Sequence, residues 1–216
     1  MPKRTPQTQG TCQWCKSQLN KTAMKKHLLS CLGKRMGESL KDGKTASQRI
    51  FLILVDGYGL SGHNYWLYLA ALGSTSFKEL DNFLRKIWVE CCGHLSAFHT
   101  GKLDIGKGQK LGHVLTPGDK FSYEYDFGDT TELKLTVLGV MEGLITKGKV
   151  QVLARNDAPA IQCSYCGKLA TDICAECLYK DKGWLCDDCG PKHGCDEGMR
   201  LPLVNSPRTG VCGYEG

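Results

Sequence analysis

Hydrophobic positions change their spacing from one segment of the chain to the next, and these changes predict the secondary structure. Residues 50–55 form an unbroken apolar run typical of a buried strand, and a second apolar run covers 64–72. Ser76 and Glu79 have the spacing of a capping box. Apolar side chains recur at helical spacing behind them, so we expect a helix that stops at Gly93.

Strand patterns dominate the following segments. Residues 94–99 are expected to form a strand, and residues 121–127 alternate strictly between aromatic and polar side chains. Gly128 and Asp129 predict a turn into a strand at 132–140, and a further strand is expected near 150–154. Residues 49–156 therefore predict a central α+β domain with a mainly antiparallel sheet and packed helices.

The two ends of the chain read as smaller units. Asn20 is a candidate cap for a helix with apolar positions Met24, Leu28 and Cys31, which we expect to end at Gly33. This places a compact unit at 8–34, followed by a polar, glycine-rich linker at 35–48. A cysteine-rich unit is expected at 160–216.

Cysteine and histidine spacing in the first unit follows the pattern C-x2-C-x11-H-x3-C, with Cys12, Cys15, His27 and Cys31 as its members. His27 and Cys31 are four residues apart, so they project from one face of the expected helix towards the Cys12–Cys15 pair. Two residues between paired cysteines suit a tetrahedral zinc shell. Because so small a unit has hardly any core, we expect zinc to supply most of its folding free energy.

The last unit offers eight candidate ligands, enough for two tetrahedral sites: Cys163, Cys166, Cys174, Cys177, Cys186, Cys189, His193 and Cys195. Interleaved pairing would join the first pair with the third and the second pair with the last two ligands. Cys212 is an alternative to Cys195, and one zinc ion with spare thiols is an alternative to two. The spacing of these candidate ligands resembles that of MYND and B-box cross-brace zinc fingers. Up to three structural zinc ions are therefore expected, since closed shells leave no open position for catalysis.

Cys91 and Cys92 have no evident partner of their own. Cys91 falls on the apolar face of the helix expected after Ser76, and we interpret it as a small packed hydrophobe.

Composition narrows the class of protein. The chain of 216 residues has no run of 18 apolar residues, which argues against a membrane span, and its basic N-terminus lacks the apolar stretch of a signal peptide. Thirteen cysteines in a protein that is not exported point to metal rather than to disulfides, because the cytosol keeps thiols reduced. We therefore expect a cytoplasmic protein.

Charge is unevenly distributed within the net +6, with +8 in residues 1–48, 0 in 49–158 and −2 in 159–216. A local basic cluster attracts phosphate backbones. The alternative interpretation is that these charges only keep the surface soluble. Lys16, Lys21, Lys25 and Lys26 suit phosphates better than bases, so we expect weak, sequence-tolerant nucleic-acid binding. The acidic last unit favours a protein partner.

The residues Phe121–Asp129, which include the letters YEYDFGD, resemble the plasmid pRiA4b ORF-3-like family, together with the upstream helix and His94–Phe98. The resemblance covers about half the chain and implies an α+β fold, no established activity and a link to mobile elements. The family commonly has Trp and His after the GD pair, whereas Thr131 and Leu133 stand here.

Three functions are compatible with these patterns. The leading hypothesis is a zinc-binding, non-enzymatic adaptor that contacts nucleic acid through its first unit and a protein through its last. The alternative is a metal-dependent nuclease or other hydrolase that uses the carboxylates of Asp126, Asp129 and Glu132. A third hypothesis makes the whole chain a protein-interaction module.

Overall fold

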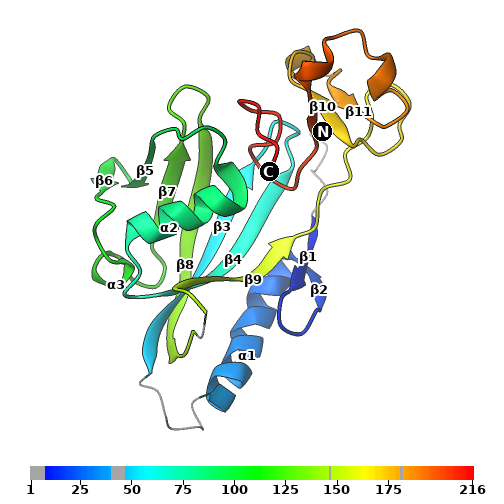
Figure 1. The fold of residues 1–216 in the computed structure, drawn as a ribbon. Helices are drawn as coiled ribbons and strands as arrows, with labels where there is room; N and C mark the ends of the chain where they lie inside the picture. Colours follow the sequence, from blue (N-terminus) through cyan, green and yellow to red (C-terminus); the bar gives the residue numbers. More distant parts are fainter. Residues whose placement is uncertain (1–7, 40–46, 146, 181) are drawn as a thin grey trace.

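A nine-stranded antiparallel sheet is the centre of the molecule (Figure 1). The computed structural model describes residues 8–39, 47–145, 147–180 and 182–216. The sheet order is β2-β1-β9-β4-β3-β8-β7-β5-β6. Its strands are β1 (Gln9–Cys12), β2 (Gln18–Asn20), β3 (Gln48–Tyr58), β4 (Asn64–Leu72), β5 (Ser96–Thr100), β6 (Leu103–Ile105), β7 (Lys120–Tyr125), β8 (Thr131–Gly143) and β9 (Val150–Asn156). The predicted α+β class with a mainly antiparallel sheet is confirmed.

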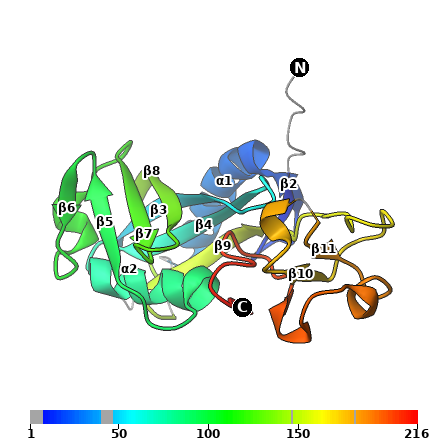
Figure 2. The ribbon, with the colours of Figure 1, turned by 90° about the horizontal axis from the view of Figure 1, so that it is seen from above.

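Helices cover both faces of this sheet, which Figure 2 shows from above with α1 and α2 on opposite sides. The helical elements of this part are α1 (Lys21–Ser39), α2 (Phe77–Leu84), η2 (Arg85–Val89) and the short α3 (Leu111–Val114). On one face α2 buries Phe77, Leu80 and Leu84 against the sheet. On the other face α1 buries Met24, Leu28 and Leu32. The two layers of side chains form two separate hydrophobic cores.

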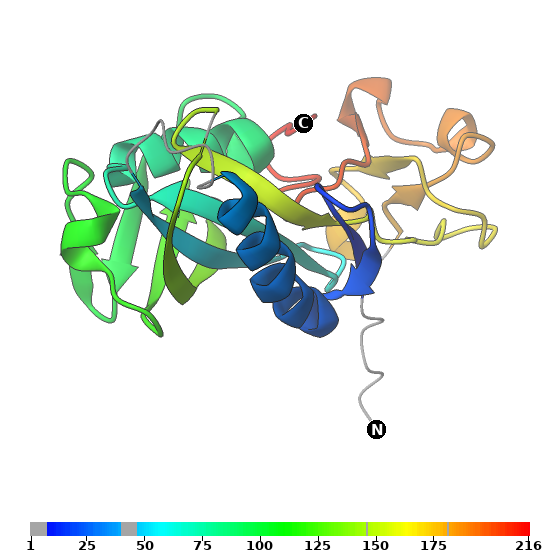
Figure 3. The same ribbon diagram turned by 90° about the horizontal axis from the view of Figure 1, so that it is seen from below.

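This arrangement explains where the apolar runs are continuous and where they alternate. Phe51 faces the α2 core and Leu52 the α1 core, and β4 alternates in the same way with Leu67 and Tyr68. Strand β7 and the first half of β8 bury only one of their faces, and their sequences alternate. The second half of β8 contacts α1, and its Leu138 and Met141 pack against the α1 core. Figure 3 shows α1 lying across the β9–β4–β3 part of the sheet.

The N-terminal unit is joined to the main sheet. Strand β1 pairs with β9 along Gly10–Asn156 to Cys12–Ala154, and the β1–β2 hairpin extends the sheet at that edge. A Cβ at Gly10 would lie 2.3 Å from Cη2 of Trp66 and 2.4 Å from the carbonyl oxygen of Arg155, so only glycine allows this approach. Helix α1 continues past Gly33, where the sequence predicted its end, to Ser39. Residues 40–46 of the predicted linker lie outside the described residues.

The capping box at Ser76 and Glu79 is confirmed, but the helix behind it ends earlier than predicted. The backbone N–H of Glu79 donates to Oγ of Ser76, and the backbone N–H of Ser76 donates to Oε2 of Glu79. The last turn widens into the π-helical η2 and ends at Val89 rather than at Gly93. Cys91 therefore lies in the loop behind the helix, which corrects its predicted place on the helix face.

The C-terminal module, residues 161–202, is inserted between β9 and a tail of residues 203–216 that returns to the sheet (Figure 1). The module holds a three-stranded sheet and short 3-10 turns: β10 (Asp172–Cys174), η3 (Leu178–Lys180), β11 (Trp184–Leu185), η4 (Gly190–Lys192), η5 (Glu197–Met199) and β12 (Arg200–Pro202). The end of β9 and the start of the tail are joined by a hydrogen bond, in which Nδ2 of Asn205 donates to the carbonyl oxygen of Asn156 at 2.7 Å.

Within the described residues, no helix is both long enough and apolar enough to cross a bilayer.

Candidate metal centres

Sixteen cysteine and histidine side chains gather into four groups of four, and within each group the ligand atoms all lie within 4.8 Å of one another. We name them the finger cluster (Cys12, Cys15, His27, Cys31), the all-cysteine cluster (Cys163, Cys166, Cys186, Cys189), the mixed cluster (Cys174, Cys177, His193, Cys195) and the tail cluster (Cys91, Cys92, His94, Cys212). All thirteen cysteines of the chain belong to one of them as free thiols. Sulfur and imidazole sets of four could hold metal ions and are compatible with zinc.

The finger cluster is assembled by a hairpin and a helix. Cys12 ends β1, Cys15 lies in the following turn, and α1 supplies the other two ligands. The turn needs a left-handed residue, and Lys16 provides it with φ of 62°. Asn20 caps α1 as predicted, because its Oδ1 accepts from the backbone N–H of Ala23 at 2.9 Å. These local features bring Nε2 of His27 to 3.1 Å from Sγ of Cys15.

Thiol acidity in the finger cluster depends on neighbouring donors and sulfurs. Hydrogen bonds from Ser17 lower the pKa of Cys15 to about 6. Burial, followed by the nearby Cys12 and Cys15, raises the pKa of Cys31 to about 11. Cys31 therefore does not ionise easily on its own, and a divalent cation beside it would favour its thiolate form.

The all-cysteine cluster unites the first and third CxxC pairs of the module, with Sγ of Cys166 3.5 Å from Sγ of Cys186. Gly167, at φ of +73°, lets the first turn close behind Cys166. Burial raises the pKa of Cys163, but backbone N–H groups that point at its sulfur outweigh burial and lower the pKa to about 6. Such N–H donors stabilise a thiolate in a metal knuckle.

The mixed cluster unites the second CxxC pair with His193 and Cys195, in the predicted interleaved order. Sγ of Cys177 lies 3.4 Å from Sγ of Cys195. Cys195 thus lies with this group, whereas Cys212, its alternative in the sequence analysis, lies elsewhere. Nε2 of His193 is buried and has no hydrogen-bond partner, whereas its Nδ1 lies 3.4 Å from the hydroxyl of Tyr165. A histidine with one ring nitrogen near a neighbouring hydroxyl and the other buried without a partner suits metal binding.

The tail cluster was not predicted. The sequence interpretation left Cys91 and Cys92 without partners, but both lie with His94 and with Cys212 from the far end of the chain. Nε2 of His94 is 2.8 Å from Sγ of Cys92 and 3.3 Å from Sγ of Cys212. Sequence spacing could not reveal this group, because Cys212 lies 118 or more residues from the other members and two of those are adjacent cysteines.

The three carboxylates of the alternative hydrolase hypothesis do not come together. Asp126 is buried and its Oδ2 accepts from Nη2 of Arg208 at 2.6 Å. Burial raises the pKa of Asp126, but Arg208 and backbone N–H groups lower it more. Asp129 is exposed in the turn, and Glu132 lines an open groove beside Lys134. In the described parts of the chain, no group of three or more metal-ligating side chains includes any of them.

The four lysines predicted to contact phosphates differ in their availability. Nζ of Lys21 donates to Oδ1 of Asp56 at 2.7 Å and to Oδ1 of Asn64 at 2.9 Å, so its charge is already paired. Lys16, Lys25 and Lys26 are exposed. The opposite side of α1 is buried against the sheet, which limits the free surface of this helix to the side with Lys25 and Lys26.

Comparisons with known proteins give no family. No protein-family model matches the chain, and no curated protein matches it. A solved structure, the protein of unknown function MM3350 from Methanosarcina mazei Go1, is similar at 15% sequence identity with a TM-score of 0.42, and the match covers 50% of this chain and 68% of that chain. A likeness of this strength carries no argument about function.

Proposed function

We propose that the protein is a zinc-braced adaptor, in which zinc ions hold the N-terminal unit and the C-terminal module in shape for contacts with two different partners. The observation that carries this proposal is the assembly of the three predicted ligand sets into compact groups of four. Thiolates and imidazoles in sets of four suit zinc, and four protein ligands fill a tetrahedral shell. Ions held in this way would act as structural braces.

The first contact we propose is with nucleic acid, through the exposed side of α1. Its support is the charge of +8 in residues 1–48 and the exposure of Lys25 and Lys26 on consecutive positions of the helix. Lys21 is paired with Asp56, so among the side chains of α1 that the structure describes, the exposed cations are Lys25 and Lys26. The expected binding is therefore weak, salt-sensitive and tolerant of sequence.

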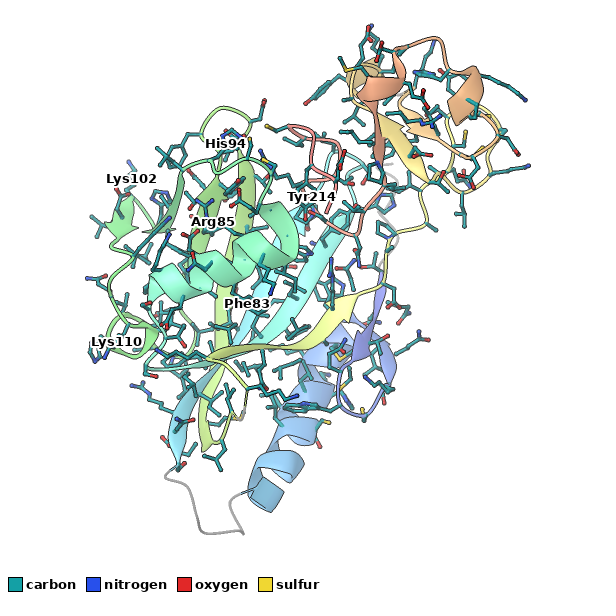
Figure 4. All side chains as sticks on the ribbon, in the orientation of Figure 1. Phe83, Arg85, His94, Lys102, Lys110 and Tyr214 are labelled. Carbon is teal, nitrogen blue, oxygen red and sulfur yellow. The ribbon has the colours of Figure 1, made fainter. Side chains whose placement is uncertain are left out.

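Charge reversal at this surface tests the nucleic-acid contact. We expect the full chain carrying Lys25→Glu and Lys26→Glu to lose most of its affinity for duplex DNA at low salt, and the slope of log affinity against log salt to fall by about 2. The measurement is a mobility shift titrated with salt. The matched control carries Lys102→Glu and Lys110→Glu, which change the charge equally at exposed sites away from α1 (Figure 4). Equal losses in both variants, or no binding of the wild type, would contradict the contact.

The second contact we propose is with a protein, through the C-terminal module. Its support is a set of large apolar side chains exposed on this small unit: Tyr165, Leu169, Tyr179 and Met199. Tyr179 is 73% exposed and Leu169 63%. A group of exposed apolar side chains is a common property of protein interfaces. The net negative charge of this segment disfavours nucleic acid as its partner.

Polar substitution on the module tests the protein contact. We expect Tyr179→Ser with Leu169→Ser to abolish retention of a partner that the immobilised wild-type chain captures from an extract of the source cells. Tyr58→Ser with Phe127→Ser is the matched control, because both residues are exposed aromatics of the central sheet region and should leave capture unchanged. Quantitative mass spectrometry of the retained proteins makes the comparison. A partner lost equally from both variants would contradict a contact through the module.

We further propose that the central sheet belongs to the pRiA4b ORF-3-like family. This proposal is supported by the Phe121–Asp129 residues, which form β7 and the turn into β8. Asp126 closes this turn from a left-handed conformation, with φ of 66°, and its Oδ1 accepts from the backbone N–H of Gly128 at 3.1 Å. The motif thus has a structural reason for its aspartate.

A further inference from the structure

The tail cluster brings four ligand atoms together from two distant parts of the chain. Cys91, Cys92 and His94 belong to the loop behind η2, and Cys212 belongs to the tail. Sγ of Cys92 lies 3.7 Å from Sγ of Cys91 and 3.7 Å from Sγ of Cys212. Nε2 of His94 lies 3.4 Å from Oδ2 of Asp126, in addition to its approaches to the two sulfurs. One imidazole N–H cannot satisfy three such neighbours, whereas a shared cation can.

Hydrogen bonds hold the loop of this cluster in place. The hydroxyl of Tyr125 donates to Oε1 of Glu90 at 2.8 Å and accepts from the backbone N–H groups of Cys91 and His94, both at 3.3 Å. Oε1 of Glu90 also accepts from the backbone N–H of Gly93 at 2.6 Å. Gly93 itself has φ of +82°, which lets the loop reverse between the ligands. The loop is thus preorganised by groups that are not ligands.

The tail is held by an equally specific set of contacts. Arg208 is fully buried, and its guanidinium donates to Asp126, to Oγ1 of Thr131 at 2.9 Å and to Sγ of Cys91 at 3.4 Å. The same guanidinium lies over the ring of Tyr125, 4.8 Å from its centroid. Oγ of Ser206 donates to the carbonyl oxygen of Trp88 at 2.6 Å. Figure 4 shows the tail beside the loop that carries His94.

Counting ligands singles out this cluster as a site. The finger, all-cysteine and mixed clusters use ten of the thirteen cysteines and two histidines. The three remaining cysteines all meet at one place, together with one further histidine. Cys212 reaches it from a left-handed backbone conformation with φ of 50°, which is unfavourable for a residue with a Cβ and therefore needs compensation from its surroundings.

We propose that Cys91, Cys92, His94 and Cys212 bind a fourth zinc ion, which clamps the tail to the central domain. The C-terminal module is inserted between β9 and the tail, so this ion would close the base of the insertion and fix the module to the sheet. A metal link between residues about 120 positions apart stabilises a fold strongly, because it removes much conformational freedom from the unfolded chain. The proposal does not depend on which partners the adaptor binds.

Zinc analysis of the full chain tests the proposal. We expect four zinc ions in the wild type, three in Cys212→Ser, and four again in Cys212→His, because imidazole can replace a thiolate as a zinc ligand. Val211→Ser, at the neighbouring position, is the matched control and should retain four. Hydrogen exchange of residues 205–214 should become faster in Cys212→Ser, by about 100-fold at free zinc 100 times the dissociation constant.

The possible outcomes separate this proposal from the proposed function. Three zinc ions in both the wild type and Cys212→Ser would overturn the fourth site and leave the adaptor intact. Zinc content near zero in both would overturn both proposals. A disulfide between Cys91 and Cys92 in protein purified under reducing conditions, detected by mass spectrometry after alkylation, would also overturn the fourth site. Retention of all four zinc ions in Cys212→Ser would show that Cys212 is not a ligand.

Discussion

Removal of zinc is expected to unfold the C-terminal module while the central sheet stays folded. Among the described residues, the core cluster of the module consists of Ile173, Leu178 and Leu201, with Ala175 and Trp184 packed against it. This apolar burial is too small to offset the conformational entropy of residues 161–202. Two structural zinc ions would supply the difference, since each contributes about 10–16 kcal/mol of apparent binding free energy in small zinc units. By contrast, the sheet buries two extended cores that consist mostly of large apolar side chains.

Titration with a strong chelator, followed by nuclear magnetic resonance of backbone amides, measures this effect. We expect amide signals of 161–202 to collapse to unfolded positions while those of β3, β4 and β8 keep their dispersion. A zinc-sensitive dye records the ions released in the same titration. Retention of the module signals after complete zinc release would contradict a bracing role.

Single-cluster variants refine the same prediction. Cys186→Ser is expected to unfold much of the module, whereas Cys15→Ser should loosen only the turn of the finger cluster. The reason is that α1 buries Met24 and Leu28 against the sheet, and this packing survives loss of the metal. Equal unfolding of both units would show that docking of α1 contributes little.

The docking of α1 also explains what the sequence could not easily predict. The Asn20 cap and the helix behind it were correct, but α1 was interpreted as part of an isolated finger. The signal for docking was present, because Leu52 and Tyr68 lie on the opposite strand faces from the α2 core and need a cover. Local periodicity assigns faces to strands, but it does not state which distant helix covers them.

Strand prediction succeeded where one face is exposed. The alternation at 121–127 gave β7, and the Gly128–Asp129 turn gave the start of β8. The predicted end of the helix at Gly93 was wrong, because η2 stops at Val89 and the loop that follows is shaped by Tyr125. The contact of Tyr125 with this loop is a tertiary interaction, which sequence spacing does not contain.

Ligand sets were predictable to the extent that they are local. The CxxC pairs, with the histidines and cysteines that follow them, identified twelve of the residues that meet in the four clusters, because two cysteines three residues apart lie in one turn. The tail cluster depends on the return of Cys212 to Cys92 and His94, which only the tertiary fold determines. The count of cysteines was the one sequence signal, since Cys91 and Cys92 had no partner and Cys212 was only an alternative to Cys195.

The second large effect is expected at Asp81, the buried carboxylate beneath the β5–β7 sheet region. Asp81 is fully buried, and its Oδ1 accepts from Nε of Arg85 at 3.0 Å, from Oγ of Ser96 at 2.8 Å and from the hydroxyl of Tyr123 at 2.8 Å. Its Oδ2 accepts from Nζ of Lys107 at 2.9 Å. Burial raises the pKa of Asp81, but these donors, led by Lys107, outweigh burial and hold the pKa well below its usual range.

Asp81→Asn is expected to destabilise the central domain by about 3–5 kcal/mol, because it leaves the charges of Arg85 and Lys107 without their shared buried partner. Urea unfolding at pH 7, monitored by the fluorescence of the buried Trp88, measures the change. Asp104→Asn is the matched control. Asp104 forms an exposed pair with His99, so its replacement should cost less than about 1 kcal/mol. A loss below about 1 kcal/mol in Asp81→Asn would contradict the role of this carboxylate.

The difference in unfolding free energy between the wild type and Asp81→Asn should depend on pH in a defined direction. A carboxyl with a lowered pKa in the folded state contributes its full stability above the unfolded pKa of about 3.9 and loses it as pH falls towards the folded pKa. The gap in unfolding free energy between wild type and Asp81→Asn should therefore be constant from pH 7 to about pH 5 and narrow below about pH 4. Zinc release at low pH affects both proteins equally, so it cancels in this difference. A gap that widens as the pH falls would mean that Asp81 is protonated in the native fold.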